Sequence, residues 1–228
     1  MVSMPRRYTP RIRSANAAKT RQRILDAALE LLPYASDVSV ERIAETASVS
    51  IQTIYTQFGS KRGLLIAAID AAQRDSGAYV DFASVWSSPD GETALRRMVE
   101  ATIRLWDRIW PLVAFTERAR RSDDEIGKHL SEVDGYRRDN LLSIMNRLDA
   151  EGRIRKDQSA EWAADLVFAL TTPSVYDELV RAASWPVDAA VSSVVDSVVL
   201  AVIAPGARSR LAEPADWSAV SLPPSMSP

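Results

Sequence analysis

The chain has 228 residues, 46% of them hydrophobic, which is enough for a buried core in one large domain or two small ones. It contains no cysteine, and this excludes disulfides and cysteine-based metal or redox chemistry. No run of about 18 apolar residues is present, so we expect a soluble protein that is not exported and works in the cytoplasm, without a membrane partner.

The net charge of −2 conceals an uneven distribution. Residues 1–62 contain ten Lys and Arg against five Asp and Glu, so this part carries +5 and the remainder carries −7. A basic head on an acidic body would approach a polyanion such as DNA in one orientation. Solvated surface charge would give the same counts.

The first predicted element is a helix that follows a basic arm. Residues 1–16 combine prolines with four arginines and little apolar pattern, which predicts a disordered arm. From about Ala18 to Leu32 apolar residues recur at helical spacing, and Pro33 ends the pattern. The residues of this stripe are Ile24, Ala27, Ala28, Leu31 and Leu32.

Two short helices joined by a tight turn are predicted next, with Ser39 and Ser50 as their N-caps. The second helix would run from Ile51 to Phe58, with Ile54 facing inward. Its outer face is rich in hydrogen-bonding groups and has no acidic residue, which suits a helix in a DNA major groove: Gln52, Thr53, Tyr55, Thr56 and Gln57. Such helix pairs also occur in all-α proteins that never bind nucleic acid, so helix-turn-helix is a hypothesis at this point.

The segment IAETASVSIQTIYTQFGSKRGLL resembles, without a gap, the DNA-binding signature of the tetracycline-repressor family of bacterial regulators. One departure is Ser48, where the family usually has glycine, and a serine enters the left-handed region only at a steric cost. The resemblance implies a three-helix DNA-binding head at residues 17–62 and a phosphate contact at Lys61. The predicted DNA-binding residues are Arg21, Ser39, Ser50, Gln52, Thr53, Tyr55, Thr56 and Lys61.

The remaining chain predicts a larger helical body at residues 63–204 and a loosely ordered tail at 205–228. Ser60 would cap a helix from Lys61 to about Ala83, and a capping box at Ser122 would begin a helix that stops at Gly152. Further helices are expected at 92–107, at 158–183 with a kink at Pro173, and at 187–204. The fold class is therefore all-α, with nine or ten helices.

Aromatic side chains in the body are compatible with a ligand cavity, although aromatics at helical spacing are more often simply core. The family resemblance implies an apolar pocket among the middle helices, where a small, mainly apolar effector would alter DNA binding. The candidate lining residues are Trp86, Trp106, Trp110, Phe115, Tyr136, Phe168 and Tyr176.

Two apolar stripes on the last two helices predict a homodimer, which would bind a pseudo-palindromic operator with two recognition helices. The candidate interface residues are Trp162, Leu166, Leu170, Val191, Val195, Val198 and Val202.

An all-α enzyme and a DNA binder without an effector are the alternative functions. The sequence has one histidine, His129, and none of the common nucleophile, phosphate-loop or zinc motifs, so we expect no catalytic residue, metal or cofactor. A protein that binds DNA without responding to an effector would make the same predicted DNA contacts. The favoured hypothesis is a dimeric transcriptional regulator, a repressor released from its operator by a small ligand.

Overall fold

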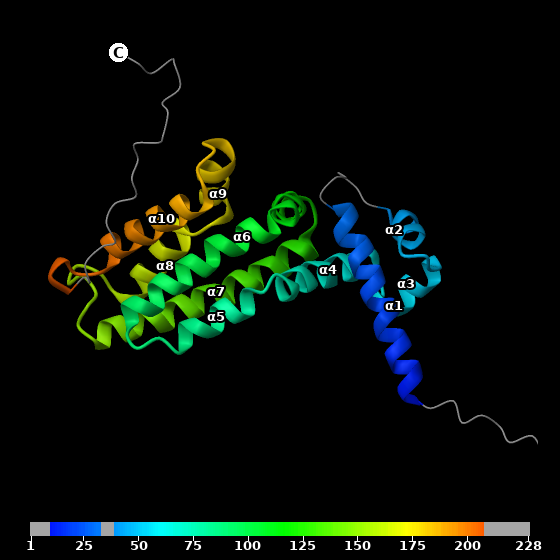
Figure 1. Ribbon diagram of the computed structural model, residues 1–228, viewed down its shortest axis with the longest axis horizontal. Coiled ribbons are helices and arrows are strands. Elements are labelled where there is room, and N and C mark those ends of the chain that lie inside the picture. The colour runs from blue at the N-terminus through cyan, green and yellow to red at the C-terminus, as the bar shows by residue number, and fades with distance from the viewer. Residues whose placement is uncertain (1–9, 33–38, 208–228) are drawn as a thin grey trace, which may run out of the picture. The chain divides into compact units, whose positions relative to one another are not determined.

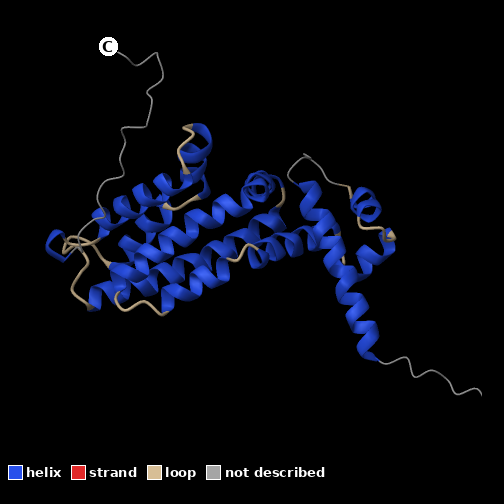
Figure 2. Ribbon diagram, viewed as in Figure 1, coloured by secondary structure: helices blue, strands red, loops and turns tan. Residues whose placement is uncertain are grey.

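The computed structural model describes residues 10–32 and 39–207, and within these ranges the regular structure is helical (Figures 1 and 2). The only pairing of β type there is an isolated antiparallel bridge between Ile154 and Ile203. The all-α prediction is confirmed. No described helix combines the length and the apolar character that a membrane crossing requires.

The chain divides into two compact units, which we treat separately. Unit 1 consists of residues 1–77 and 109–133, and unit 2 consists of residues 78–108 and 134–228. The predicted boundary between residues 62 and 63 falls inside a helix, and the structure divides the chain elsewhere.

The described residues of unit 1 form four complete helices and parts of two others. The complete helices are α1 (Pro10–Leu31), α2 (Val40–Thr46), α3 (Ile51–Phe58) and α4 (Lys61–Asp75). Their inner faces form one apolar core, in which Ile24, Ile43, Ile54 and Leu64 are fully buried. Burial of these apolar faces stabilises helices that would be too short to persist alone in water.

Helix α1 begins at Pro10, earlier than predicted, so residues 10–16 of the expected arm are helical and only 1–9 lie outside the described residues. Proline is well suited to the first position of a helix, because its missing N–H has no intrahelical partner there. The Arg and Ala residues that follow are good helix formers even without an apolar stripe. Pro33 and residues 34–38 lie outside the description.

Helix α4 ends at Asp75, and α5 (Ala78–Trp86) is separate, so the predicted continuous helix to Ala83 is wrong. The break falls at Gly77, whose φ of 76° lies in the left-handed region. Glycine adopts this conformation without the steric cost that other residues incur, and it therefore ends helices readily.

Helix α6 (Gly91–Ser122) contains a kink at Ile109, where the backbone leaves helical geometry (φ −112°, ψ 16°). Pro111 follows the kink, as expected of a residue that lacks an N–H donor. Helix α7 (Asp124–Ala150) begins after Asp123, whose side chain accepts from the backbone N–H of Ile126. The predicted cap at Ser122 is therefore wrong, since Ser122 ends α6.

The C-terminal helices of unit 2 are α8 (Ala160–Leu170), α9 (Pro173–Tyr176), a π-helix (Asp177–Ala182) and α10 (Val187–Val202), followed by a 3₁₀ turn (Pro205–Ala207). The predicted kinked helix at 158–183 is instead broken. Thr171 leaves helical geometry, and Pro173 starts a new helix. The carbonyl of Thr171 accepts from Trp106 Nε1 (3.0 Å) and from Arg137 Nη1 (3.1 Å), so side chains from two other helices satisfy the interrupted end.

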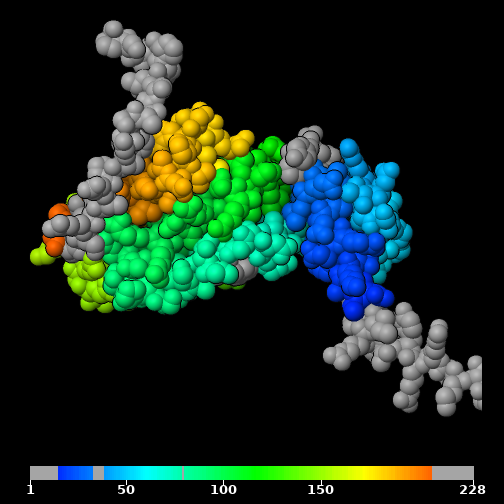
Figure 3. Space-filling view, viewed as in Figure 1, coloured from blue at the N-terminus to red at the C-terminus, as the bar shows by residue number. Residues whose placement is uncertain are grey.

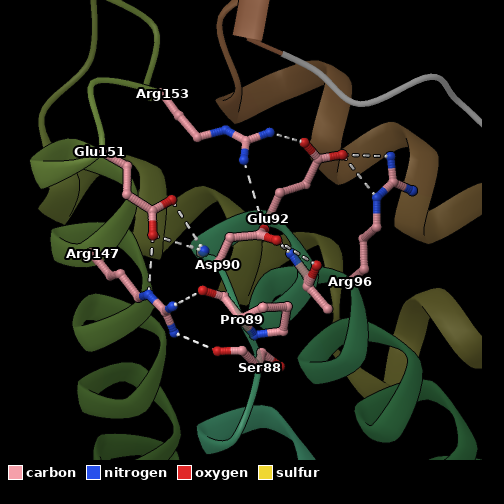
Figure 4. A network of polar contacts seen from close by, with 10 residues as sticks. Ser88, Pro89, Asp90, Glu92, Arg96, Arg147, Glu151 and Arg153 are labelled. Atoms are coloured by element: carbon pink, nitrogen blue, oxygen red, sulfur yellow. Dashed lines mark hydrogen bonds and ion pairs between the residues drawn. The ribbon is translucent and has the colours of Figure 1, made fainter.

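A buried polar network lies at the start of α6 (Figure 4). The Glu92 side chain is 2% exposed and forms ion pairs with Arg96 (3.0 Å) and Arg153. Arg96 also contacts Asp196 of α10 at 3.3 Å. The network therefore connects α6 to α10 and to the segment after α7, and the burial of Glu92 strengthens its two ion pairs.

A second part of the network joins the end of α7 to the loop before α6. The guanidinium of Arg147 donates to the carbonyls of Ser88 (3.1 Å) and Pro89 (2.6 Å). The Glu151 carboxylate accepts from the backbone N–H of Gly91 at 3.0 Å. These bonds satisfy backbone groups of a loop that has no ladder or helix to pair with.

Candidate nucleic-acid interface

Helices α2 and α3 are joined by a turn whose ends are capped by their own side chains. Ser39 Oγ accepts from Arg42 N and Ser50 Oγ accepts from Thr53 N, both at 3.2 Å. Both predicted N-caps are confirmed. Each serine meets a backbone donor of the first helical turn that would otherwise be unsatisfied.

The turn itself requires a left-handed residue, and Ser48 has φ 52°. Its N–H donates to Glu45 O (3.0 Å), and Val49 N donates to Ala44 O (2.9 Å), which is the bonding pattern of a Schellman motif. The predicted steric cost of a serine at this position is thus present. The two bonds keep the turn in place despite that cost.

Helix α3 lies at the surface of unit 1, where its outer side is accessible (Figure 3). Ile54 is fully buried and anchors the helix, whereas Tyr55 is 42% exposed. Among the predicted DNA-binding residues on α3, Gln52, Tyr55 and Thr56 are exposed and Thr53 is half-buried. The polar outer face expected from the sequence is therefore brought together on one helix.

Arg21 supports α3 from helix α1. Its Nη1 donates to the carbonyl of Gln57 (3.1 Å), and its guanidinium carbon lies 4.3 Å from the centre of the Phe58 ring. The cation thus meets the negative end of the helix dipole and a ring face together. Arg21 was predicted to contact DNA, and its observed contacts show that it supports α3. Its guanidinium is exposed and has N–H donors beyond the one that binds Gln57.

The junction between α3 and α4 depends on two glycines. Gly59 ends α3 with φ 75°, and Ser60 Oγ accepts from Gly63 N at 3.0 Å. A Cβ on Gly63 would lie 2.2 Å from the carbonyl oxygen of Phe58, so only glycine lets the first turn of α4 approach the end of α3. Lys61, the first residue of α4, is half-buried and follows the end of α3 by three residues.

Arg62 connects the same helix end to the α6–α7 corner. Arg62 Nε donates to Asp123 Oδ2 at 2.5 Å, and Nη1 lies 3.2 Å from Glu125 Oε1. The hydrogen bond from Arg62 lowers the pKa of the Asp123 carboxyl below its usual value. A groove of about 410 Å³ lies beside this pair, with Lys61, Arg118 and Phe115 among its lining residues.

Not all of the seven aromatic residues predicted to line one apolar pocket face the interior. Trp86 (53% exposed) and Tyr136 (72% exposed) face solvent. These two residues were chosen for composition and helical position, and neither property determines which side of a helix faces inward.

Three of the aromatics pack instead around the break between α8 and α9. Arg137 stacks on Phe168 (3.9 Å from guanidinium carbon to ring centre) and lies 5.6 Å from the Trp106 ring. Tyr176 is buried, and its hydroxyl donates to Asp107 Oδ1 at 2.7 Å. Burial, together with this hydrogen bond, raises the pKa of Tyr176 well above its usual value, so the phenol remains a donor.

A cavity of about 500 Å³ does occur in unit 2, between α5 and α6, and its lining is polar. Arginine and acidic side chains surround it, including Arg97, Arg104, Arg108, Asp81 and Glu100. Arg108 Nη1 donates to Asp81 Oδ2 at 2.7 Å, so part of this charge is already paired. None of the seven predicted aromatics lines this cavity.

The valines predicted to form a dimer interface are buried in the core of unit 2. Val191, Val195, Val198 and Val202 are at most 9% exposed, so little of them remains for a partner. Leu166 and Leu170 are half-buried. The large apolar side chains left exposed on α8 and α10 are Trp162 (51%) and Leu200 (42%), of which only Trp162 was predicted.

Comparison with known proteins bears on the helix-turn-helix directly. Residues 24–68, which contain α2, α3 and the start of α4, match the family model described as bacterial regulatory proteins, tetR family. The segment that holds α2 and α3 is therefore of the tetR type. LfrR of Mycolicibacterium smegmatis, an HTH-type transcriptional repressor, is 28% identical over 164 residues, which cover 71% of this chain and 80% of LfrR.

Solved structures of tetR-like regulators share the fold along most of the chain. A transcriptional regulator from Saccharomonospora viridis, solved with choline, has a TM-score of 0.69 at 19% identity and covers 82% of this chain and 99% of its own. FadR from Bacillus subtilis, solved with stearoyl-CoA, has a TM-score of 0.65 at 21% identity. The match covers 78% of this chain and 97% of FadR. At these identities the likeness concerns the fold alone.

The matched segment and the similarity to LfrR indicate a tetR-like transcriptional regulator, a class of proteins that are not enzymes. His129, to which the sequence assigned no role, contacts Asp70 at 3.0 Å. Sequence reasoning missed the contacts of Arg62 and Arg137 and the requirement for Gly63. A glycine in the first turn of a predicted helix was a usable signal for Gly63, since glycine is unfavourable in a helix unless space demands it.

Proposed function

We propose that the protein represses transcription as a dimer that binds double-stranded DNA through α3 and releases it when a small molecule binds. The observation that carries the proposal is the exposed outer face of α3, held in place by Arg21 and by the α3–α4 junction. A rigidly supported helix with exposed amide and hydroxyl groups suits the major groove.

Lys61 and the first turn of α4 are proposed to contact a DNA phosphate. The α4 N-terminus presents backbone N–H groups, and its dipole favours an anion. A lysine at this end is unfavourable in the free helix and favourable when a phosphate binds, which explains why a cation stands there. Ser39 and Ser50 lie at the N-termini of α2 and α3, where backbone groups likewise suit phosphates.

The test begins with selection of bound duplexes from a random DNA library, followed by titration of the selected operator. Gln52→Ala should relax preference at particular base pairs, whereas Lys61→Ala should weaken binding to all sequences and lower the log-log salt slope by roughly one. Lys156 is an exposed lysine of unit 2, and Lys156→Ala is the matched control. It should leave the base-pair preference and the salt slope unchanged. Unchanged selectivity and salt slope in the first two variants would contradict the proposed interface.

The proposed dimer forms through α8 and α10, on which Trp162 and Leu200 are the exposed apolar residues. Exposed tryptophan is typical of residues that dominate binding energy at interfaces. Trp162→Ala with Leu200→Ser should shift the protein from dimer to monomer in sedimentation at micromolar concentration. The buried Val195 is unsuitable for this test, because a charge there would disrupt the core of the chain itself. A monomeric parent protein would refute the dimer.

The proposed effector binds unit 2, and its supports are the two tetR-like structures solved with choline and with stearoyl-CoA. A coupling energy of about 1 to 3 kcal/mol would weaken operator binding roughly 5- to 150-fold. A thermal-shift screen of apolar, amphipathic and charged compounds would identify ligands. Saturating operator must then weaken ligand binding by the same factor. If a ligand binds with equal affinity in the presence and in the absence of operator, the protein binds DNA but does not respond to that ligand.

A further inference from the structure

The exposed arc of α3 is less polar than its sequence indicates. At about 100° per residue, the four exposed residues of the helix (Ile51, Gln52, Tyr55 and Thr56) share one contiguous side. Thr56 Oγ1 donates its proton to the carbonyl of Gln52 at 2.7 Å. A hydroxyl has one proton, so Thr56 presents to solvent a methyl group and an acceptor, and no donor.

Thr53, at the edge of this arc, has a similarly engaged hydroxyl. Its Oγ1 lies 2.8 Å from Ser50 Oγ, and one of the two hydroxyl protons is shared between them. Ser50 Oγ also accepts from Thr53 N as the cap of the helix. The Ser50–Thr53 pair thus keeps one unused hydroxyl proton at the start of the helix, whereas the proton of Thr56 is fully engaged.

Ile51 adds a larger apolar group to the same arc. It is the first residue of α3 and is 38% exposed, whereas the other isoleucine of the helix, Ile54, is completely buried. The N-terminal residues of a recognition helix are those that reach base edges. Within the described part of the chain, the side chains that keep unused donors on this arc are Gln52 and Tyr55.

We infer that Ile51 recognises the C5-methyl group of a thymine in the operator. In the major groove this methyl distinguishes thymine from the other bases, and apolar side chains contact it. Gln52 lies between Ile51 and Thr56 on the arc and is suited to a bidentate contact with adenine. The inference rests on the proposed DNA-binding function and specifies what its recognition helix reads.

The experiment uses the selected operator with each thymine replaced singly by deoxyuridine, which removes only the methyl group. At one thymine of each half-site the parent protein should lose affinity roughly three- to fivefold, the effect of one buried methyl group. Ile51→Ala should bind the unmodified operator more weakly and should lose its sensitivity to that single replacement. Ile51→Val, which keeps a branched apolar side chain, should retain the sensitivity.

Additive effects of Ile51→Ala and of every deoxyuridine replacement would overturn the inference, because groups that do not touch contribute independently. A selected operator whose affinity is unchanged by all replacements would also overturn it, while leaving DNA binding intact. Failure to select any operator would instead refute the proposed function. The two failures are therefore distinguishable in the same series of measurements.

Discussion

The buried carboxylate of Glu92 offers the sharpest test of how unit 2 is held together. Its side chain is 2% exposed and lies between Arg96 and Arg153, which are 25% and 20% exposed. Glu92→Gln keeps the shape of the side chain and removes its charge. Two guanidinium groups would then lose their shared anion in a place that water reaches only in part.

The expected loss follows from these exposures. Removing one partner of a fully buried ion pair costs about 3 to 5 kcal/mol. The arginines are partly solvated, and they keep contacts with Asp196 (3.3 Å) and Asp90 (3.6 Å), so a smaller loss is expected. We predict about 2 to 3 kcal/mol of unfolding free energy, or a Tm lower by about 4 to 12 °C.

Glu100→Gln is the matched control on the same helix. Glu100 pairs with Arg104 in the same i, i+4 arrangement as Glu92 with Arg96, but its side chain is 47% exposed. Its removal should cost less than about 0.5 kcal/mol, as for other exposed pairs. Urea denaturation of both variants, followed by circular dichroism, measures the difference. Equal losses for the two variants would show that burial does not govern the strength of these pairs.

Three further predictions concern unit 1 and helix α7. Gly63→Ala should lower both Tm and operator affinity, because the added Cβ would lie 2.2 Å from a backbone oxygen. Gly135 has open space around it, so Gly135→Ala should stabilise α7 by up to about 1 kcal/mol. Ser48→Gly should relieve the left-handed strain and raise stability by up to about 1 kcal/mol, net of the freedom glycine adds to the unfolded chain. The lowered pKa of Asp123 means that its contribution is present above pH 3.8, its ordinary pKa, and is lost as the pH falls through the folded pKa. Asp123→Asn should therefore be less stable than the parent at pH 7, and the gap should close in acid denaturation curves below pH 3.8.

Local signals in the sequence determined most of the helix-turn-helix. The caps at Ser39, Ser50 and Ser60 each depend on a hydrogen bond to a backbone N–H three residues ahead, so sequence spacing alone was sufficient to predict them. The left-handed turn at Ser48 was expected from the family resemblance, because glycine usually stands at this position. The resemblance to the tetR family was also visible in the sequence, because the motif lies in one uninterrupted segment.

The tertiary structure decided which faces are buried and where helices break. The helix interruption at Thr171 is stable because Trp106 and Arg137, 65 and 34 residues away in sequence, donate to its carbonyl. The valines of α10 could have faced a partner or the chain's own core, and only packing in three dimensions buries them. The exposure of Ile51 likewise depends on how α3 packs against its neighbours. Apolar periodicity shows that a helix has a buried side, but the partner that buries it is set by contacts distant in sequence.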